Sequence, residues 1–166
     1  MPLLVDAGSI RERIEALPTQ VFPEGTPILS VGTSTGKLFI LASGTAEVMK
    51  DGVRLCELTE PGAVLGEISA LLGQPHTADV RAVTACTFRV ADATEFLRGD
   101  PTAALLVATI MAKRLDAANQ ALVEVRREIS ADKPRSVVGR ALDRLAEALR
   151  QDTDPELARY MYGGWM

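Results

Sequence analysis

The sequence predicts an α+β fold, namely an antiparallel β-roll or jelly roll with flanking helices and a long C-terminal helix of the dimerisation type. Three observations predict it. Glycine and proline recur every few residues up to about residue 75, with short apolar or alternating runs between them. Short strands with regular turn signals are typical of a closed sandwich or barrel. After about residue 91 the apolar residues follow a helical period, and two helix-start signals appear there.

The expected strands are the short runs between the turn signals. A short helix is expected first, at residues 9–17. The dipeptide Asp51-Gly52 is the signal of a tight hairpin between two neighbouring strands. The strands are expected at residues 28–31, 37–41, 45–49, 53–56, 77–83 and 85–90.

Two helix starts follow the last expected strand. Asp92 is an N-cap candidate with Glu95 at the capping-box position, and Gly99 ends that helix. Asp100 and Pro101 then open a long helix as N-cap and first helical residue, and this helix contains no breaker before Pro134.

The long helix carries an apolar seam spaced 4, 3, 4, 3, 4, which is a heptad pattern. Either the seam packs on the chain's own barrel or it pairs with a second copy, and its length and narrowness favour a homodimer through residues 101–130. The seam consists of Met111, Leu115, Ala118, Leu122, Val125 and Ile129. The charged residues beside it are interpreted as a solvated face; they are Lys113, Arg114, Glu124, Arg126, Arg127 and Glu128.

The expected domains are the β-roll with its long helix at residues 1–130 and a helical extension at 131–166. The extension is expected to contain a helix at about 135–150. The aromatic end of the tail at 151–166 either docks on a partner or packs on the domain.

Composition indicates a cytoplasmic protein with an aliphatic core. Of the 166 residues, 47% are hydrophobic but only 4% aromatic, and the net charge is −4, which argues against a dedicated nucleic-acid binder. Cys56 and Cys86 belong to no metal-ligand cluster and are interpreted as buried, inert thiols. No apolar run is long enough to span a membrane, and no secretory signal is expected at the N-terminus.

Residues 65–78 combine the residue types that hold a compact anion attached to a sugar. Gly66 permits a tight turn at the end of a strand, and the short helix expected after it directs its first amide groups at an anion. Glu67 can accept hydrogen bonds from sugar hydroxyls. A Gly-Gln-Pro turn then brings His76 and Thr77 back toward the helix start, so the segment predicts a pocket.

This segment resembles the phosphate-binding cassette of the cyclic-nucleotide-binding family, which reads Phe-Gly-Glu-Leu/Met-Ala-Leu, a short loop, then Arg-Ala/Ser/Thr-Ala. Residues 22–28 resemble the family's entry strand, residues 37–44 its Tyr-Phe-Ile-Leu-x-Gly strand and residues 58–67 its approach to the pocket. The resemblance therefore covers about residues 10–130. It implies cAMP or cGMP as the ligand, with the ribose at the glutamate and the phosphate at the arginine; no cofactor or metal is implied. The implied ligand-binding residues are Gly66, Glu67, Ile68, Ser69, His76, Thr77, Ala78 and Asn119.

One position departs from the family pattern, because His76 stands where the phosphate-binding arginine is expected. An imidazole offers one hydrogen bond and partial charge, where arginine offers a charged, bidentate grip. Either His76 contacts the anion or it lies at the mouth of a vestigial pocket. If it contacts phosphate, affinity is expected to rise as the pH falls from about 7.5 to 6.

The long helix adds a second resemblance, to the dimer helix of bacterial catabolite activator proteins. In that family a Thr-Ser pair at the positions of Ala118 and Asn119 helps to contact the purine. Ala118 has no side-chain hydrogen bond to give, whereas Asn119 has. A core role for Ala118 and a solvent role for Asn119 are equally consistent, so the sequence does not choose between cAMP and cGMP.

The function expected is a ligand-sensing regulatory module that signals through helix or dimer rearrangement, and not an enzyme. The alternatives are a degenerate cyclic-nucleotide-binding fold that binds a protein partner and a truncated Crp/Fnr-type transcription regulator. Residues 137–146 resemble the first helix of the Crp/Fnr DNA-binding domain. DNA binding is disfavoured because no recognition helix fits before residue 166.

Overall fold

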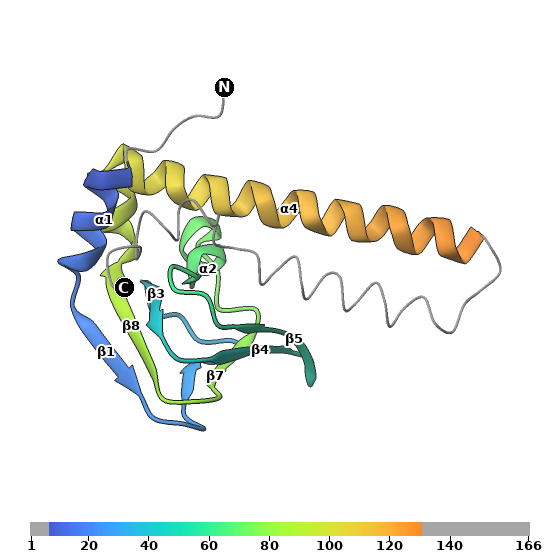
Figure 1. Cartoon of the computed structure of the whole chain (residues 1–166), viewed down its shortest axis with the longest axis horizontal. Helices are drawn as coiled ribbons and strands as arrows, with labels where there is room; N and C mark the ends of the chain where they lie inside the picture. Colours follow the sequence, from blue (N-terminus) through green and yellow to red (C-terminus); the bar gives the residue numbers. More distant parts are fainter. Residues whose placement is uncertain (1–6, 131–166) are drawn as a thin grey trace, which may run out of the picture.

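The structure is a computed structural model that describes residues 7–130. Its strands and short helices form a roll, and a long helix crosses one side of the roll and extends past it (Figure 1). The elements in chain order are α1 (Ala7–Glu15), β1 (Thr19–Phe22), β2 (Pro27–Leu29), β3 (Lys37–Ser43), β4 (Ala46–Lys50), β5 (Val53–Leu58), β6 (Val64–Leu65), α2 (Glu67–Leu72), β7 (Asp79–Ala82), β8 (Cys86–Asp92), α3 (Ala93–Gly99) and α4 (Pro101–Ser130).

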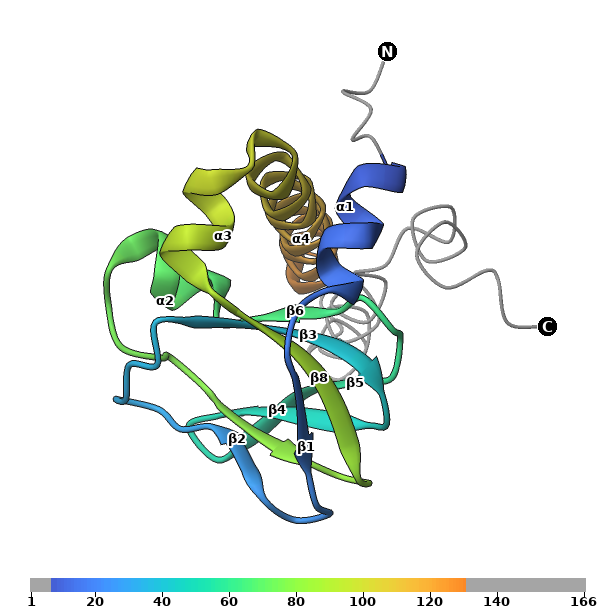
Figure 2. The same ribbon diagram turned by 90° about the vertical axis from the view of Figure 1, so that its left-hand side faces the viewer.

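Two four-stranded sheets build the roll. One has the strand order β1-β8-β3-β6 and the other β2-β7-β4-β5, and every strand pair is antiparallel. Helices α1, α3 and α4 lie together on the outer side of the first sheet (Figure 2). The fold class predicted from the sequence, an antiparallel β-roll with flanking helices and a long helix, is therefore confirmed.

Strand β3 is buried on both faces, so it separates two hydrophobic cores. Phe39 and Leu41 point into the roll, whereas Leu38 and Ile40 belong to the second core, beneath the helices. This alternation follows from the period of two along a strand. Inside the roll, three phenylalanines meet edge to face with ring centroids 5.8 to 6.2 Å apart: Phe22, Phe39 and Phe88.

The turn signals in the sequence correctly predicted the positions of the strands in which apolar and polar residues alternate. Asp51 and Gly52 both have positive φ, at 51° and 77°, which is the geometry of a tight hairpin turn between β4 and β5. Strands β1 and β6 were not among the expected strands. Only Phe22 of β1 is buried, and β6 contains two residues, so neither strand offers an alternating pattern.

Both predicted helix starts are confirmed. The carboxylate of Asp92 accepts a hydrogen bond of 2.9 Å from the backbone N–H of Glu95, at the start of α3. The carboxylate of Asp100 accepts one of 2.7 Å from the N–H of Thr102, at the start of α4. These bonds satisfy amide groups that have no partner inside their helices.

Helix α4 packs on the rest of the domain mainly through its first three turns. Leu115 and Leu122 of the predicted seam are 63% and 65% exposed, so these leucines do not pack on the roll. Met111, at the start of the seam, packs against the second core. The residues that α4 buries in its first three turns are Ala103, Leu106, Val107 and Ile110.

Cys56 and Cys86 are both buried in the core of the roll, and no disulfide joins them, as the sequence predicted. Within residues 7–130 there is no group of three or more side chains suited to hold a metal ion. No helix in that range has the length and hydropathy needed to cross a membrane. The extension expected at 131–166, with its helix and tail, lies outside the described residues, so the division into two domains stays a prediction.

Candidate functional site

A cavity of about 220 Å³ opens between the second sheet, the short helix α2 and the middle of α4. Its wall is mostly apolar, and its charged lining residues are Glu67, Lys50 and Arg114. The apolar wall comes from Leu29, Val48, Leu55, Cys56, Leu58, Leu65 and Val80. Such a cavity, with a few polar groups on an apolar wall, is the usual form of a small-molecule site.

Gly66 places α2 against the first sheet. It adopts a φ of +87°, and a Cβ at this position would lie 2.5 Å from the carbonyl oxygen of Lys37. Glycine is therefore required for two reasons, the left-handed backbone and the close approach of β3. Within α2, the hydroxyl of Ser69 donates a hydrogen bond of 2.6 Å to the carbonyl of Gln74, in the turn that follows the helix.

Glu67 and Arg114 form a buried ion pair in the cavity wall. Their side chains are 4% and 15% exposed, and the Arg114 guanidinium donates a hydrogen bond to the Glu67 carboxylate. A second guanidinium nitrogen donates to the carbonyl oxygen of Val64 at 2.9 Å. A buried carboxylate requires a charged partner of this kind. The pair therefore joins α4 to both ends of the turn that leads into α2.

His76 is buried between the cavity and the loop before β3. Its backbone N–H donates to Thr33 at 2.7 Å, and its carbonyl oxygen accepts a hydrogen bond of 2.9 Å from Gly32. Nε2 of the ring lies 3.1 Å from Oγ1 of Thr35, which accepts a hydrogen bond of 3.3 Å from the N–H of Lys37. The tautomer of the ring decides whether Nε2 donates to the Thr35 hydroxyl or accepts from it.

The charge state of His76 follows from its surroundings. Desolvation by burial lowers the pKa of His76, so the imidazole is neutral near pH 7. Within the described residues, Nδ1 has no hydrogen-bond partner. The residue that replaces the expected arginine therefore brings no positive charge to the cavity wall near pH 7.

Seven of the eight predicted site residues lie together in this cavity. They are Gly66, Glu67, Ile68, Ser69, His76, Thr77 and Ala78. The eighth, Asn119, is exposed on α4 and is not among the lining residues.

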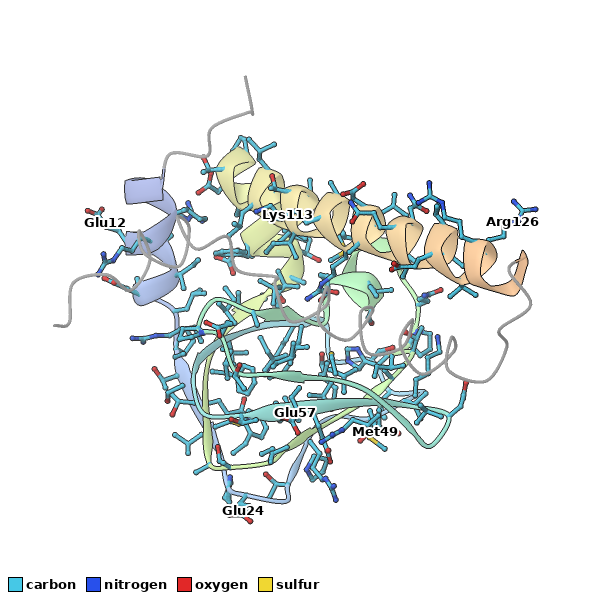
Figure 3. The ribbon with its side chains drawn as sticks, turned by 45° about the vertical axis from the view of Figure 1, so that its right-hand side comes forward. Glu12, Glu24, Met49, Glu57, Lys113 and Arg126 are labelled. Carbon is cyan, nitrogen blue, oxygen red and sulfur yellow. The ribbon has the colours of Figure 1, made fainter. Side chains whose placement is uncertain are left out.

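Sequence reasoning missed Arg114, which it assigned to the solvated face of the long helix, and that assignment is wrong. Arg114 follows Ile110 by four residues and precedes Ala121 by seven, so it continues the buried face of α4. This helical spacing is the sequence signal by which Arg114 could have been assigned to the buried face. Lys50 was also missed, because nothing in its own strand distinguishes it from a solvent-exposed lysine. By contrast Arg126, farther along the same helix, points away from the sheets (Figure 3).

Residues 19–99 match the family model described as the cyclic nucleotide-binding domain. This match confirms, over these residues, the resemblance found in the sequence. A search of curated proteins found no match.

Solved structures agree on the fold. The catabolite activator protein of Thermus thermophilus has a TM-score of 0.57 and 19% identity, with 98% of this chain and 97% of that chain covered. The regulatory domain of Toxoplasma gondii PKA, solved with cAMP, has a TM-score of 0.52 and 20% identity, covering 63% of this chain and 45% of that one.

A third similar structure is the regulatory subunit of a cAMP-independent protein kinase A from Trypanosoma brucei. It has a TM-score of 0.50 and 25% identity, and the match covers 57% of this chain and 35% of that chain. The matches thus cover less than half of the Toxoplasma and Trypanosoma structures. The fold is therefore shared by a structure solved with cAMP and by a subunit described as independent of it.

Proposed function

We propose that this domain is a regulatory module, without catalytic activity, that binds a cyclic nucleotide in the cavity beside α2 and signals through α4. The observation that carries the proposal is the Glu67–Arg114 pair. It places the carboxylate expected to bind the ribose in direct contact with the helix expected to carry the signal.

The proposed mechanism is an exchange of hydrogen-bond partners at Glu67. In the free protein its carboxylate accepts from Arg114 of α4. A ribose 2′-hydroxyl that donates to the same carboxylate changes the strength and geometry of that pair. Because Arg114 also holds the carbonyl of Val64, any adjustment is felt on both sides of the turn into α2. Ligand binding is thereby linked to the position of α4.

A degenerate fold that serves a protein partner is the second candidate, and one observation favours it. His76 is neutral and is held by Thr35, so the cassette lacks the charged grip on phosphate that the family's arginine provides. Loss of one charge-assisted hydrogen bond lowers affinity by roughly 10- to 100-fold. A truncated Crp/Fnr-type regulator stays an alternative whose DNA-binding residues would lie outside the described range.

Three further features belong to the proposal. Either cAMP or cGMP is accepted as ligand, since Asn119, the predicted base contact, is not a lining residue. The module works as a homodimer through α4. It acts in the cytoplasm, where the two cysteines stay reduced.

Calorimetric titration of the nucleotide-stripped full chain with cAMP and with cGMP tests the proposal, beside the His76→Arg variant. Micromolar or tighter binding by the native chain supports a working sensor and gives its base preference. Binding by His76→Arg alone means that the cavity is intact but silenced, which rejects the sensor function in favour of the protein-interaction role. A Thr35→Val variant serves as the control that frees the His76 ring without adding charge.

A further inference from the structure

We propose that Lys50 supplies the positive charge for the ligand's anionic group that the cassette lacks at His76, so that the anion-binding charge has moved from the cassette to the β4–β5 hairpin. This inference rests on the proposed function, because it names the residue that recognises the anion in the same cavity.

The first argument is the charge balance of the cavity wall. Its charged residues are two cations, Lys50 and Arg114, and one anion, Glu67. Arg114 is paired with Glu67, so the net charge of the wall is one positive charge, and that charge is on Lys50. Within residues 7–130, Lys50 forms no ion pair. The cavity therefore attracts an anion even though the cassette histidine is neutral.

The second argument is where the strand register places Lys50. Strand β4 pairs with β7 up to Met49 opposite Asp79, so Lys50 comes one step later, beside Ala78 and Thr77. These two residues follow His76 and form the second arm of the cassette. Lys50 thus reaches the cavity from the strand adjacent to the position where the family arginine stands.

The third argument is the face of β4 that carries Lys50. Val48 and Lys50 both line the cavity, as residues two apart on a strand do. Met49, labelled in Figure 3, lies between them in sequence and on the opposite face of the strand, and it is not a lining residue. Lys50 is itself exposed, so its flexible stem can bring the ammonium group to an anion at the cavity mouth.

Two titrations of the full chain test this inference. In the first, cAMP and its uncharged counterpart adenosine are titrated into native protein, Lys50→Met and Lys50→Arg. We expect Lys50→Met to weaken cAMP binding about 10-fold, with little change for adenosine, and Lys50→Arg to restore it. We also expect the native affinity for cAMP to fall with added salt more steeply than that of Lys50→Met. Lys37→Met is the matched control, since Lys37 is an exposed cation near the cassette that does not line the cavity.

The second titration separates the failure of this inference from the failure of the proposed function. Inorganic phosphate is added to ¹⁵N-labelled protein, and the amide signals of His76, Thr77 and Ala78 are followed. Phosphate-dependent shifts that Lys50→Met abolishes support the inference even if no cyclic nucleotide binds. Equal cAMP affinity in native protein and Lys50→Met overturns it while the sensor function stands. Absence of both phosphate shifts and cAMP binding in native protein overturns both.

Discussion

The guanidinium of Arg114 lies against the carboxylate of Glu67, 47 residues earlier in the chain, and the same group holds the carbonyl of Val64 at 2.9 Å. The Arg114 side chain thereby connects α4 to the start of α2, the short helix that lines the cavity. The relationship has consequences for stability, because both partners are buried.

Replacing Arg114 alone leaves the Glu67 carboxylate buried without its charged partner. We expect Arg114→Met to lower the free energy of unfolding by about 3–5 kcal/mol, and Glu67→Gln combined with Arg114→Met to recover a large part of that loss. Urea denaturation followed by circular dichroism measures both. Arg127→Met, at an exposed position on the same helix, is the control. Equal losses in the single and double variants would mean that the pair does not act as a unit.

The single histidine of the chain makes stability depend on pH in a defined direction. Burial lowers the pKa of His76 below the value near 6.5 that an unfolded chain has. As the pH falls below about 6.5, the unfolded state binds a proton before the folded state does, so the free energy of unfolding decreases. Above that pH the imidazole is neutral in both states, and His76 does not lower the stability. We expect the urea midpoint to drop more between pH 7 and pH 5 in native protein than in His76→Gln. A drop of the same size in both would remove His76 as its source.

The pH dependence of binding distinguishes His76 from Lys50 as the group that meets the anion. With the His76 pKa lowered and the charge on Lys50, the affinity for cAMP is expected to stay constant from pH 7.5 to about 6.5. Calorimetry across this interval checks it. If affinity instead rises as the pH falls, and His76→Gln abolishes the rise, the anion is held by a protonated His76.

Gly66 is required by the local packing as well as by its backbone conformation. Gly66→Ala is expected to destabilise the protein and to displace α2, because the added Cβ meets the carbonyl of Lys37 at 2.5 Å. Gly52→Ala is the matched control, since Gly52 also has a positive φ but has open space around it. We expect a loss of about 1–2 kcal/mol for Gly52→Ala from backbone strain alone and a larger one for Gly66→Ala. Thermal unfolding of the two variants measures the difference.

The exposed leucines of α4 bear on the oligomeric state. Leu115 and Leu122 lie seven residues apart, so they occupy equivalent heptad positions on α4. Both are more than 60% exposed in the single chain, as expected for residues that become buried only when two helices pair. Sedimentation equilibrium is expected to give about twice the chain mass of 17.8 kDa for native protein, and the chain mass for Leu115→Glu combined with Leu122→Glu. A native chain that stays monomeric at all concentrations would contradict the dimer.

The sequence predicted the parts of the fold and site that depend on local patterns. The cassette could be located because Gly66, Glu67, His76 and Thr77 lie within twelve consecutive positions. The helix caps at Asp92 and Asp100 followed from residue types at fixed offsets in the same way. Features of this kind depend only on residues close together in the sequence, so they can be predicted without knowing which strands pair.

The parts that escaped prediction depend on contacts between distant segments. Arg114 belongs to the site because α4 brings it to Glu67 at the start of α2, and Lys50 belongs to it because β4 lies beside β7. Both relationships are set by sheet order and helix packing, which no short motif records. Asn119 shows the reverse case, since its expected role depended on the orientation of α4, and the structure places it in an exposed position outside the cavity wall.

The way α4 is attached gives it the mechanics of a lever. Its most fully buried residues run from Ala103 to Ile110, and Arg114 lies one turn beyond them. At 1.5 Å of rise per residue, Arg114 is about 6 Å from Ile110 and Ser130 about 30 Å from it. A rigid rotation about Ile110 that moves Arg114 by about 1 Å therefore moves the end of the helix by about 5 Å. A small shift of Arg114, of the size expected when a hydrogen bond at Glu67 changes, would thus move Ser130 several times farther. A molecule bound at that end of α4 would be displaced with it.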